Sequence, residues 1–273
     1  MNQTDYSVLM SVYEKEQALF LRESIESMLS QTIMPKDFVL VCDGPLTQEL
    51  DGMIEGYEKE YPQLFQIVRL PENVGLGRAL NEGMKRCRCE VIARMDSDDV
   101  SLADRMERQL SALWEQQADI VSGTLVEFDE QHPEGGRKRM LPQEPDEIRK
   151  FARRRNPFNH PCTIYKKTSV MKSGGYQHFA GFEDYYLWVR MLMAGMRGYN
   201  VQETVLRMRV TGMYQRRGGW NYAKSIIKFR LYLLKNRFCS LGDFLYTVVG
   251  HVGVSLLPIR LREWFYNKML RRR

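Results

Sequence analysis

The stretch that decides the fold is "EVIARMDSDDV", residues 90–100, in which an apolar run leads directly into the acidic run 96–99. Carboxylates that lie close together repel one another, so packing alone gives no reason to gather three of them. Hard cations such as Mg²⁺ and Mn²⁺ prefer oxygen ligands, and they commonly take one or two carboxylates together with the phosphates of a nucleotide. The stretch therefore predicts a strand that ends in a metal site, with Asp96 and Asp98 as ligands.

A structural explanation accounts for part of the acidic run. Asp99 or Ser101 could cap a helix that begins near Leu102, because a side-chain oxygen at that position accepts hydrogen bonds from the first free amides of a helix. Capping explains one acidic residue and leaves two without a reason. We therefore favour the metal site.

Strands and helices alternate on both sides of this stretch. Apolar and β-branched runs predict strands at 6–13, 37–44, 65–70 and 118–128, and apolar residues at helical spacing predict helices at 18–29, 47–61, 76–87 and 102–117. Such alternation with short connections predicts an α/β fold with a mostly parallel central sheet flanked by helices. Ligands of these sheets bind beyond the carboxyl ends of the strands, so Asp43 and Asp96 should share one crevice.

The chain after residue 128 is less regular. We expect a strand at 162–167, a helix at 182–195, a strand at 201–210 and helices from residue 220 onward. Residues 204–273 hold 15 Lys or Arg against 2 Asp or Glu, so the end of the chain is a separate, strongly basic region. We therefore predict a catalytic domain over 1–219 and a basic amphipathic helical region over 220–273.

This basic region suits an anionic membrane surface. Its apolar run, 245–257, has 13 residues, fewer than the roughly 20 that a membrane-spanning helix needs. We expect peripheral attachment to the cytoplasmic face of the inner membrane. A helical pair that simply packs on the catalytic domain is the alternative. An RNA-binding module would also want basic helices, but an acidic crevice does not fit that role, so no nucleic-acid partner is expected.

The cysteines and the start of the chain point to a reducing compartment. The five cysteines form no disulfide or zinc-binding pattern, and "MNQTDYSVLM" lacks the basic and apolar regions of a secretory signal. We expect reduced cysteines in a cytoplasmic protein.

Four further motifs allow two interpretations each. "ENVGLGRALNEG", 72–83, offers glycines and helix amides to an anion, but it is neither a P-loop nor a dinucleotide-binding fingerprint. The acids of "FED" either favour a helix N-terminus or include a general base. The histidine of "NHP" is better explained as a structural turn residue. The arginines of "RMRVTGMYQRRGG" clamp a diphosphate or form a solvated basic surface.

Together these motifs resemble the family 2 glycosyltransferases, inverting enzymes with a Rossmann-like GT-A fold. The resemblance is carried by "SVLMSVYEKE", "VLVCDG", "ENVGLGRALNEG", "ARMDSDDV" and "GFEDYYLWVRM", which follow the family's order over 6–195. "NHPCTIY" and "RVTGMYQRRGG" look like the bacterial exopolysaccharide and capsule subgroup of amylovoran-type enzymes. Many members have an acid where this chain has Cys42, so binding there must rely on Asp43.

The resemblance implies a role for each motif residue. Asp98 is the chief protein ligand of Mg²⁺ or Mn²⁺, Asp96 lies near the ribose and the metal, and Asp184 is the catalytic base. Nucleotide-sugar contacts are expected at Val12, Tyr13, Glu14, Asp43 (on the uracil ring), Asn73, Gly75, Arg78, Arg94, Asp96, Arg209 and Arg216. Contacts to the sugar or the acceptor are expected at His160, Glu183 and Trp188.

The activity so implied is the transfer of a hexose or N-acetylhexosamine from a UDP-sugar to a lipid-linked or oligosaccharide acceptor, with inversion, in surface polysaccharide biosynthesis. A nucleotidyltransferase that makes a sugar nucleotide is the enzymatic alternative. It would want a glycine-rich phosphate loop after the first strand, and "SVYEKEQ" has no glycine. The non-enzymatic alternative is a module that binds membrane surfaces.

Overall fold

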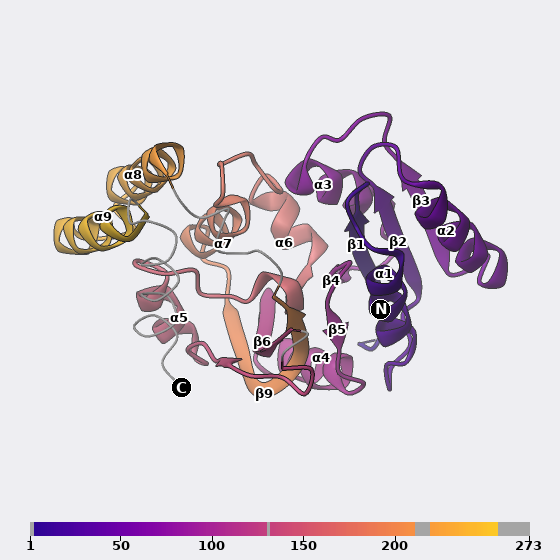
Figure 1. Cartoon of the computed structure of the whole chain (residues 1–273). Helices are drawn as coiled ribbons and strands as arrows, with labels where there is room; N and C mark the ends of the chain where they lie inside the picture. Colours follow the sequence, from indigo (N-terminus) through magenta and orange to yellow (C-terminus); the bar gives the residue numbers. More distant parts are fainter. Residues whose placement is uncertain (1–2, 130–131, 211–218, 256–273) are drawn as a thin grey trace.

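One mixed sheet organises the chain, of which the computed structural model describes residues 3–129, 132–210 and 219–255 (Figure 1). Within these residues the sheet has nine strands in the order β3-β2-β1-β4-β8-β6-β9-β5, with β7 paired to β6. The strands of the first half are β3 (Phe65–Arg69), β2 (Asp37–Cys42), β1 (Tyr6–Val12) and β4 (Val91–Asp96). All neighbours in this half are parallel, as the alternation of strands and helices predicted.

The second half of the sheet is mixed, because β8 runs against β4 whereas β6 and β9 run in the same direction as β4. β8 (Ile164–Lys166) runs antiparallel to both β4 and β6 (Ile120–Phe128), and β6 pairs in parallel with β9 (Gly198–Arg209). Two short strands were not expected from the sequence: β7 (Lys138–Arg139) and β5 (Val100–Ser101). β5 follows the acidic run directly and pairs antiparallel with β9, so this pairing fixes the far end of the acidic loop.

Helices cover both faces of the sheet (Figure 1). They are α1 (Ala18–Leu29), α2 (Gln48–Glu60), α3 (Leu76–Arg86), α4 (Arg105–Glu115), α5 (Pro145–Phe151), α6 (Lys167–Lys172), α7 (Glu183–Met193), α8 (Trp220–Lys235) and α9 (Leu241–Ser255). Alternate strand residues face opposite sides, so Val8 and Met10 belong to a core with α1, α2 and α4, whereas Leu9 belongs to a core with α3, α7 and α8.

The capping explanation of the acidic run is wrong. α4 begins at Arg105 after Asp104, and Ser101 is a strand residue in β5. Asp99 precedes β5, so it is separated from the helix by a strand and a turn.

The end of the described chain forms a helical pair beside α7 (Figure 1). The ring of Phe229 in α8 stacks on Phe182 (4.9 Å between centroids) and contacts Tyr185 (4.7 Å). Among the described helices, none combines the length and the apolar character that crossing a bilayer requires. The five cysteines are free thiols, as the sequence indicated.

The contact of α3 with the sheet predicts a sharp response to one methyl group. A Cβ added to Gly83 would lie 2.5 Å from both Leu9 Cδ1 and Val41 Cγ2. We expect Gly83→Ala to lower the free energy of unfolding by about 1–3 kcal/mol, because overpacking of a core exceeds the gain in helix propensity. Gly52→Ala on exposed α2, where nothing lies within 4 Å, is the matched control and should raise it slightly. Urea titrations of both variants decide, and a stabilised Gly83→Ala would contradict the packing.

Candidate active site

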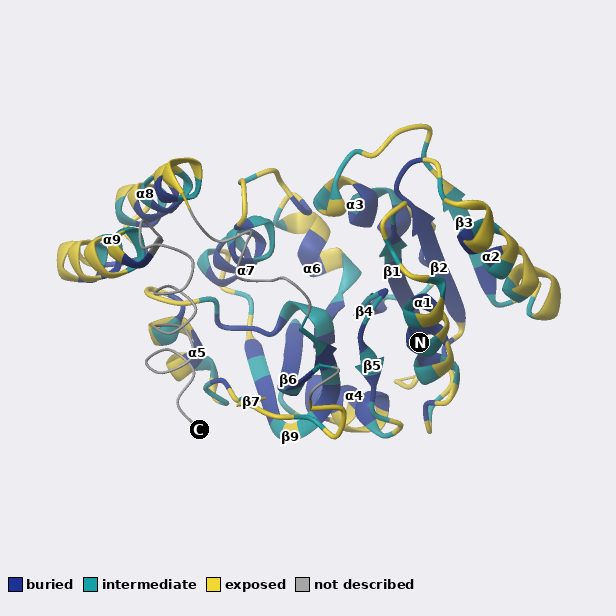
Figure 2. Cartoon of the chain, in the orientation of Figure 1, coloured by how far each residue is buried: buried dark blue, intermediate teal, exposed yellow. Residues whose placement is uncertain are grey.

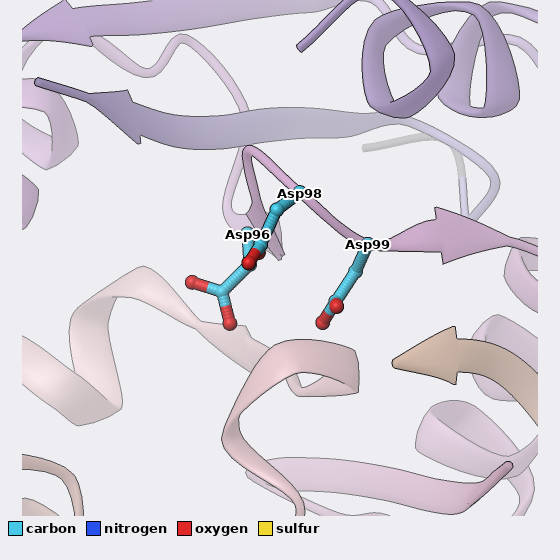
Figure 3. Close-up of side chains that lie close together, drawn as sticks. All are labelled: Asp96, Asp98 and Asp99. Carbon is cyan, nitrogen blue, oxygen red and sulfur yellow. The ribbon is translucent and has the colours of Figure 1, made fainter. Parts of the chain in front are cut away.

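Three carboxylates lie together at the end of β4. Asp96 closes the strand, and Asp98 and Asp99 follow in the loop that leads to β5. One carboxylate oxygen from each lies within 4.8 Å of the other two. Figure 3 shows all three side chains on the same side of this loop. The site that the sequence predicted from Asp96 and Asp98 therefore also includes Asp99.

The electrostatics of this cluster favour a bound cation. Burial, followed by the negative charges of Asp96 and Glu16, raises the pKa of Asp98 to about 7. Burial, followed by the negative charges of Asp96 and Asp98, raises the pKa of Asp99 well above its usual range. Asp99 Oδ2 is buried and has no hydrogen-bond partner. A buried oxygen without a donor, in an all-oxygen set, fits a hard divalent ion such as Mg²⁺ or Mn²⁺.

Arg209, at the end of β9, holds the acidic loop. Its backbone amide donates to Asp99 Oδ1 (2.8 Å), and its Nε donates to the carbonyl oxygen of Asp98 (3.0 Å). Its Nη2 pairs with Glu23, and its guanidinium lies 3.8 Å from the centre of the Phe20 ring. Its Nε and Nη2 are therefore engaged with the acidic loop and with Glu23, and its contact with a diphosphate stays a prediction. Arg216 lies outside the described residues.

Buried side chains pack behind Asp96 on the side of the protein core. Arg94 pairs with the Asp96 carboxylate, and its Nε and Nη1 are buried without partners. Burial and the charge of Arg94 hold the pKa of His160 well below its usual range, so this imidazole stays neutral. His160 Nε2 is hydrogen-bonded to the Tyr176 hydroxyl at 3.0 Å. Trp188 packs against the His160 ring with 5.9 Å between centroids.

Three predicted ligand contacts are therefore core residues. Trp188 and Val12 have no exposed surface, and Arg94 has almost none. Their side chains form the wall behind the site, and direct contact with a nucleotide or sugar through these side chains is not possible in this arrangement. Sequence motifs place such residues near a ligand but do not distinguish the layer that touches it from the layer behind.

Asp43 lies at the same sheet edge as Asp96, as predicted. β1 separates the two strands and pairs with both, so that Val12 is opposite Cys42 and Ser11 is opposite Asp96. The buried Asp43 carboxylate accepts hydrogen bonds from the amides of Val74 (2.7 Å) and Gly75 (3.1 Å). These hydrogen bonds hold the loop before α3 at the sheet edge. In its predicted role, Asp43 would have to accept a hydrogen bond from the uracil ring in addition to these two.

Asn73 and Gly75, which the sequence assigned to the same ligand as Asp43, lie beside Asp43. Asn73 Nδ2 donates to the carbonyl oxygen of Asp43 (3.2 Å). Gly44 has a φ of +91°, and a Cβ there would lie 2.8 Å from the Asn73 amide nitrogen, so only glycine fits. Tyr13 and Glu14 follow β1, and the Arg78 side chain is exposed on α3. These positions leave their side chains accessible.

Asp184 is the second residue of α7 and is held from a neighbouring segment. Its Oδ2 accepts a hydrogen bond from Asn156 Nδ2 (2.7 Å), and its Oδ1 accepts one from the amide of Tyr185 (2.7 Å). Glu183 Oε1 lies 3.6 Å from His178 Nδ1 instead. The charges of Asp184 and Asp96 both add to the rise that burial causes in the pKa of Tyr176. Asn156 was not predicted from the sequence.

The fold and this cluster define a class of protein. A sheet edge that carries three clustered carboxylates and, apart from them, an oriented carboxylate offers the residue types that a group-transfer enzyme uses. The comparisons with known proteins identify the class more closely: residues 7–174 match the family model of Glycosyl transferase family 2, and the chain belongs to this family. It is a glycosyltransferase.

Two relatives match nearly the whole chain. It is 36% identical to the amylovoran biosynthesis glycosyltransferase AmsE of Erwinia amylovora, over 96% of this chain and 98% of the relative. It is 34% identical to an Escherichia coli UDP-Gal:alpha-D-GlcNAc-diphosphoundecaprenol beta-1,3-galactosyltransferase, over 98% of this chain and 97% of the relative.

Solved structures confirm the predicted GT-A fold. S. aureus TarS 1-349 in complex with UDP-GlcNAc has a TM-score of 0.65 at 15% identity, over 97% of this chain and 76% of the TarS chain. The mannosyltransferase PcManGT of Pyrobaculum calidifontis, in complex with GDP-Man and Mn²⁺, has a TM-score of 0.61 at 15% identity, over 96% of this chain and 79% of the other.

The raised pKa of Asp99 predicts a conflict between stability and metal binding. A group whose pKa rises on folding destabilises the fold progressively as pH rises above the unfolded pKa. We expect Asp99→Asn without metal to be more stable than wild type at pH 8, by roughly 1–3 kcal/mol, and to be more stable by a smaller amount at pH 5. With saturating MnCl₂ the order at pH 8 should reverse, because wild type gains stability from binding.

Thermal unfolding at both pH values, with EDTA or MnCl₂, measures this difference. Glu134→Gln, an exposed loop acid, is the control and should change neither comparison. A less stable Asp99→Asn at pH 8 in EDTA would show that the three carboxylates do not oppose folding.

Proposed function

We propose that this glycosyltransferase transfers a hexose or N-acetylhexosamine from a UDP-sugar to a lipid-linked saccharide during surface polysaccharide synthesis, and that it inverts the anomeric configuration. The observation that carries the proposal is the cluster of Asp96, Asp98 and Asp99 at the end of β4. The near full-length similarity to a galactosyltransferase of lipid-linked GlcNAc supports the choice of donor and acceptor.

The residues at the sheet edge divide the work of binding the donor. Asp96, Asp98 and Asp99 would hold Mn²⁺ or Mg²⁺, which when bound neutralises the diphosphate of the departing UDP. Arg209 keeps the loop of these ligands in place through its contacts with Asp98 and Asp99. The accessible side chains of Tyr13, Glu14 and Arg78 remain the predicted contacts of the nucleotide.

Asp184 acts as the general base toward the acceptor. Its carboxylate takes the proton of the acceptor hydroxyl as that oxygen attacks the anomeric carbon from the face opposite UDP. The amide of Asn156 holds Asp184 Oδ2, and the amide of Tyr185 holds Oδ1, so the carboxylate keeps one orientation. The residues 1–219 would form the catalytic part, and 220–273 would attach it to the cytoplasmic face of the membrane.

A donor screen tests the proposed function. UDP release is measured with UDP-Glc, UDP-Gal and their N-acetyl forms, with and without a short-chain GlcNAc-diphospholipid acceptor, and the product linkage is read by NMR. We expect release to require acceptor, to stop in EDTA and to return with MnCl₂. Asp98→Ala should lower the rate on the order of 10²-fold or more. Full activity in EDTA, or diphosphate release from a sugar phosphate and UTP, would contradict the proposal.

The orientation of Asp184 predicts which carboxylate is the base. Asp184→Asn keeps the side-chain shape but removes the basic oxygen, so we expect kcat to fall by roughly 10²- to 10⁴-fold. The dissociation constant of UDP, measured by calorimetry, should hardly change. Glu183→Gln is the matched control one position away, where the helix points about 100° elsewhere. Near-normal turnover of Asp184→Asn with an inactive Glu183→Gln would assign the base to Glu183.

A further inference from the structure

Three polar side chains of α9 face the protein, beside the buried Val254 and the partly buried Phe244 and Val252. Asp243 and Thr247 are buried, and His251, one turn further, is partly buried. The Asp243 carboxylate accepts hydrogen bonds from the Ser240 amide (3.1 Å) and hydroxyl (2.8 Å) and pairs with Arg154. His251 Nδ1 lies 3.3 Å from Arg230 Nη2, and burial lowers its pKa to about 4, so it is neutral.

The opposite side of α9 faces outward and carries no charge. Its large side chains are Leu241 (61% exposed), Leu245 (53%), Tyr246 (70%) and Val249 (73%). Exposed glycines 242, 250 and 253 lie between and beyond them. A surface helix in water normally shows the reverse arrangement. An apolar stripe of this kind therefore marks a surface that another apolar phase covers.

The neighbouring helix α8 adds positive charge beside this stripe. Its exposed side chains recur at helical spacing after Trp220: Asn221, Lys224, Lys228, Leu231 and Lys235. No acidic residue occurs in α8. α8 and α9 lie side by side (Figure 1), and the exposed parts of both helices are on the side away from the sheet (Figure 2).

We propose that the outer face of α8 and α9 is a docking surface for an anionic lipid bilayer. The apolar stripe of α9 enters the boundary between head groups and acyl chains, while the lysines of α8 stay at the lipid phosphates and Trp220 at the interface. The helix is too short to cross, so it lies on the membrane. The purpose of this docking rests on the proposed function, in which the acceptor is lipid-linked and lies in the same membrane.

The charges favour a bilayer over a second copy of the chain. A symmetric dimer through this face would bring lysine stripes together, and no exposed acid on the described parts of α8 and α9 would compensate for them. A lipid phosphate surface supplies that compensation. The surface consists of described residues. It includes most of the apolar run 245–257, on which the sequence prediction of attachment was based, and does not rest on 256–273.

Vesicle flotation of the full chain tests the docking surface. The vesicles are phosphatidylethanolamine with phosphatidylglycerol, and phosphatidylcholine alone, each at low and high salt. We expect wild type to float with the anionic vesicles and to bind less at high salt. Leu245→Glu with Val249→Glu should lower the bound fraction at least about 10-fold on anionic vesicles. Lys224→Glu with Lys228→Glu should weaken binding to the anionic vesicles by about 5-fold or more for each lysine replaced. The variant should then bind anionic and neutral vesicles equally.

Two matched controls separate position from composition. Met140→Glu with Met171→Glu changes exposed apolar residues elsewhere, and Lys59→Glu with Lys172→Glu changes exposed lysines elsewhere. Both should float as wild type does, and circular dichroism checks that each variant is folded. Wild-type flotation of the α9 variant would overturn the proposal. The proposal would also be overturned if wild type were a dimer in solution and the α9 variant a monomer that still floats. The face would then join two copies of the chain.

The activity assay keeps this inference separate from the proposed function. On a water-soluble short-chain acceptor, the α8 and α9 variants should turn over as wild type does, whereas on acceptor embedded in vesicles their rates should fall with their bound fractions. Loss of flotation with unchanged rates on embedded acceptor would contradict the purpose that we assign to docking. Flotation without transfer to any acceptor would leave the surface in place and refute the proposed function.

Discussion

The structure depends on holding three carboxylates together against their mutual repulsion. Two arginines restrain them: Arg94 pairs with the Asp96 carboxylate, while Arg209 donates from its side chain to the carbonyl oxygen of Asp98 and from its backbone amide to the Asp99 carboxylate. Ser24 in α1 adds a hydrogen bond to the carbonyl oxygen of Asp96 (2.6 Å). Folding alone would not select such an arrangement, because an amide replacement such as asparagine keeps a side-chain acceptor oxygen without the repulsion between charges.

The strand order after β4 explains how Arg209 reaches the acidic loop. The parallel half brings the ends of β2 and β4 to one edge but supplies few positive charges there. β8 runs antiparallel to β4, but β6 and β9 run in the same direction as β4, so the end of β9 lies at the same edge of the sheet as the acidic loop. The pairing of β5 with β9 closes the arrangement, so Arg209 reaches a loop 110 residues earlier in the chain.

This long separation marks the limit of what the sequence could predict. The parallel strands, the shared edge of Asp43 and Asp96 and the helix of Asp184 follow from local periodicity and motif order, and all three are present. The clamp by Arg209, the hydrogen bond from Asn156 and the burial of Trp188 depend on pairings between distant segments, which leave no periodic signal. Asp99 is an intermediate case, because the run of acids is visible but burial decides which oxygens share one centre.

The sequence also did not predict which side of α9 faces the protein. This orientation links the docking surface to α7, which carries Asp184. An amphipathic pattern does not say which side is turned inward, and here the buried Arg230 of α8 decides it. Arg230 Nη2 donates to the carbonyl oxygen of Arg154 (2.7 Å) and lies beside His251 of α9, while Arg230 Nη1 lies 3.4 Å from the Tyr185 hydroxyl of α7.

One buried guanidinium therefore joins four segments: α7, which carries Asp184, the end of the segment that leads to Asn156, and both outer helices. The stacking of Phe229 on Phe182 adds an apolar contact to the same junction. Because the two groups that define the proposed base, Asp184 and Asn156, adjoin this junction, a surface that fixes α8 and α9 also fixes the base. A membrane-bound acceptor would then meet a carboxylate whose position is set relative to the membrane itself.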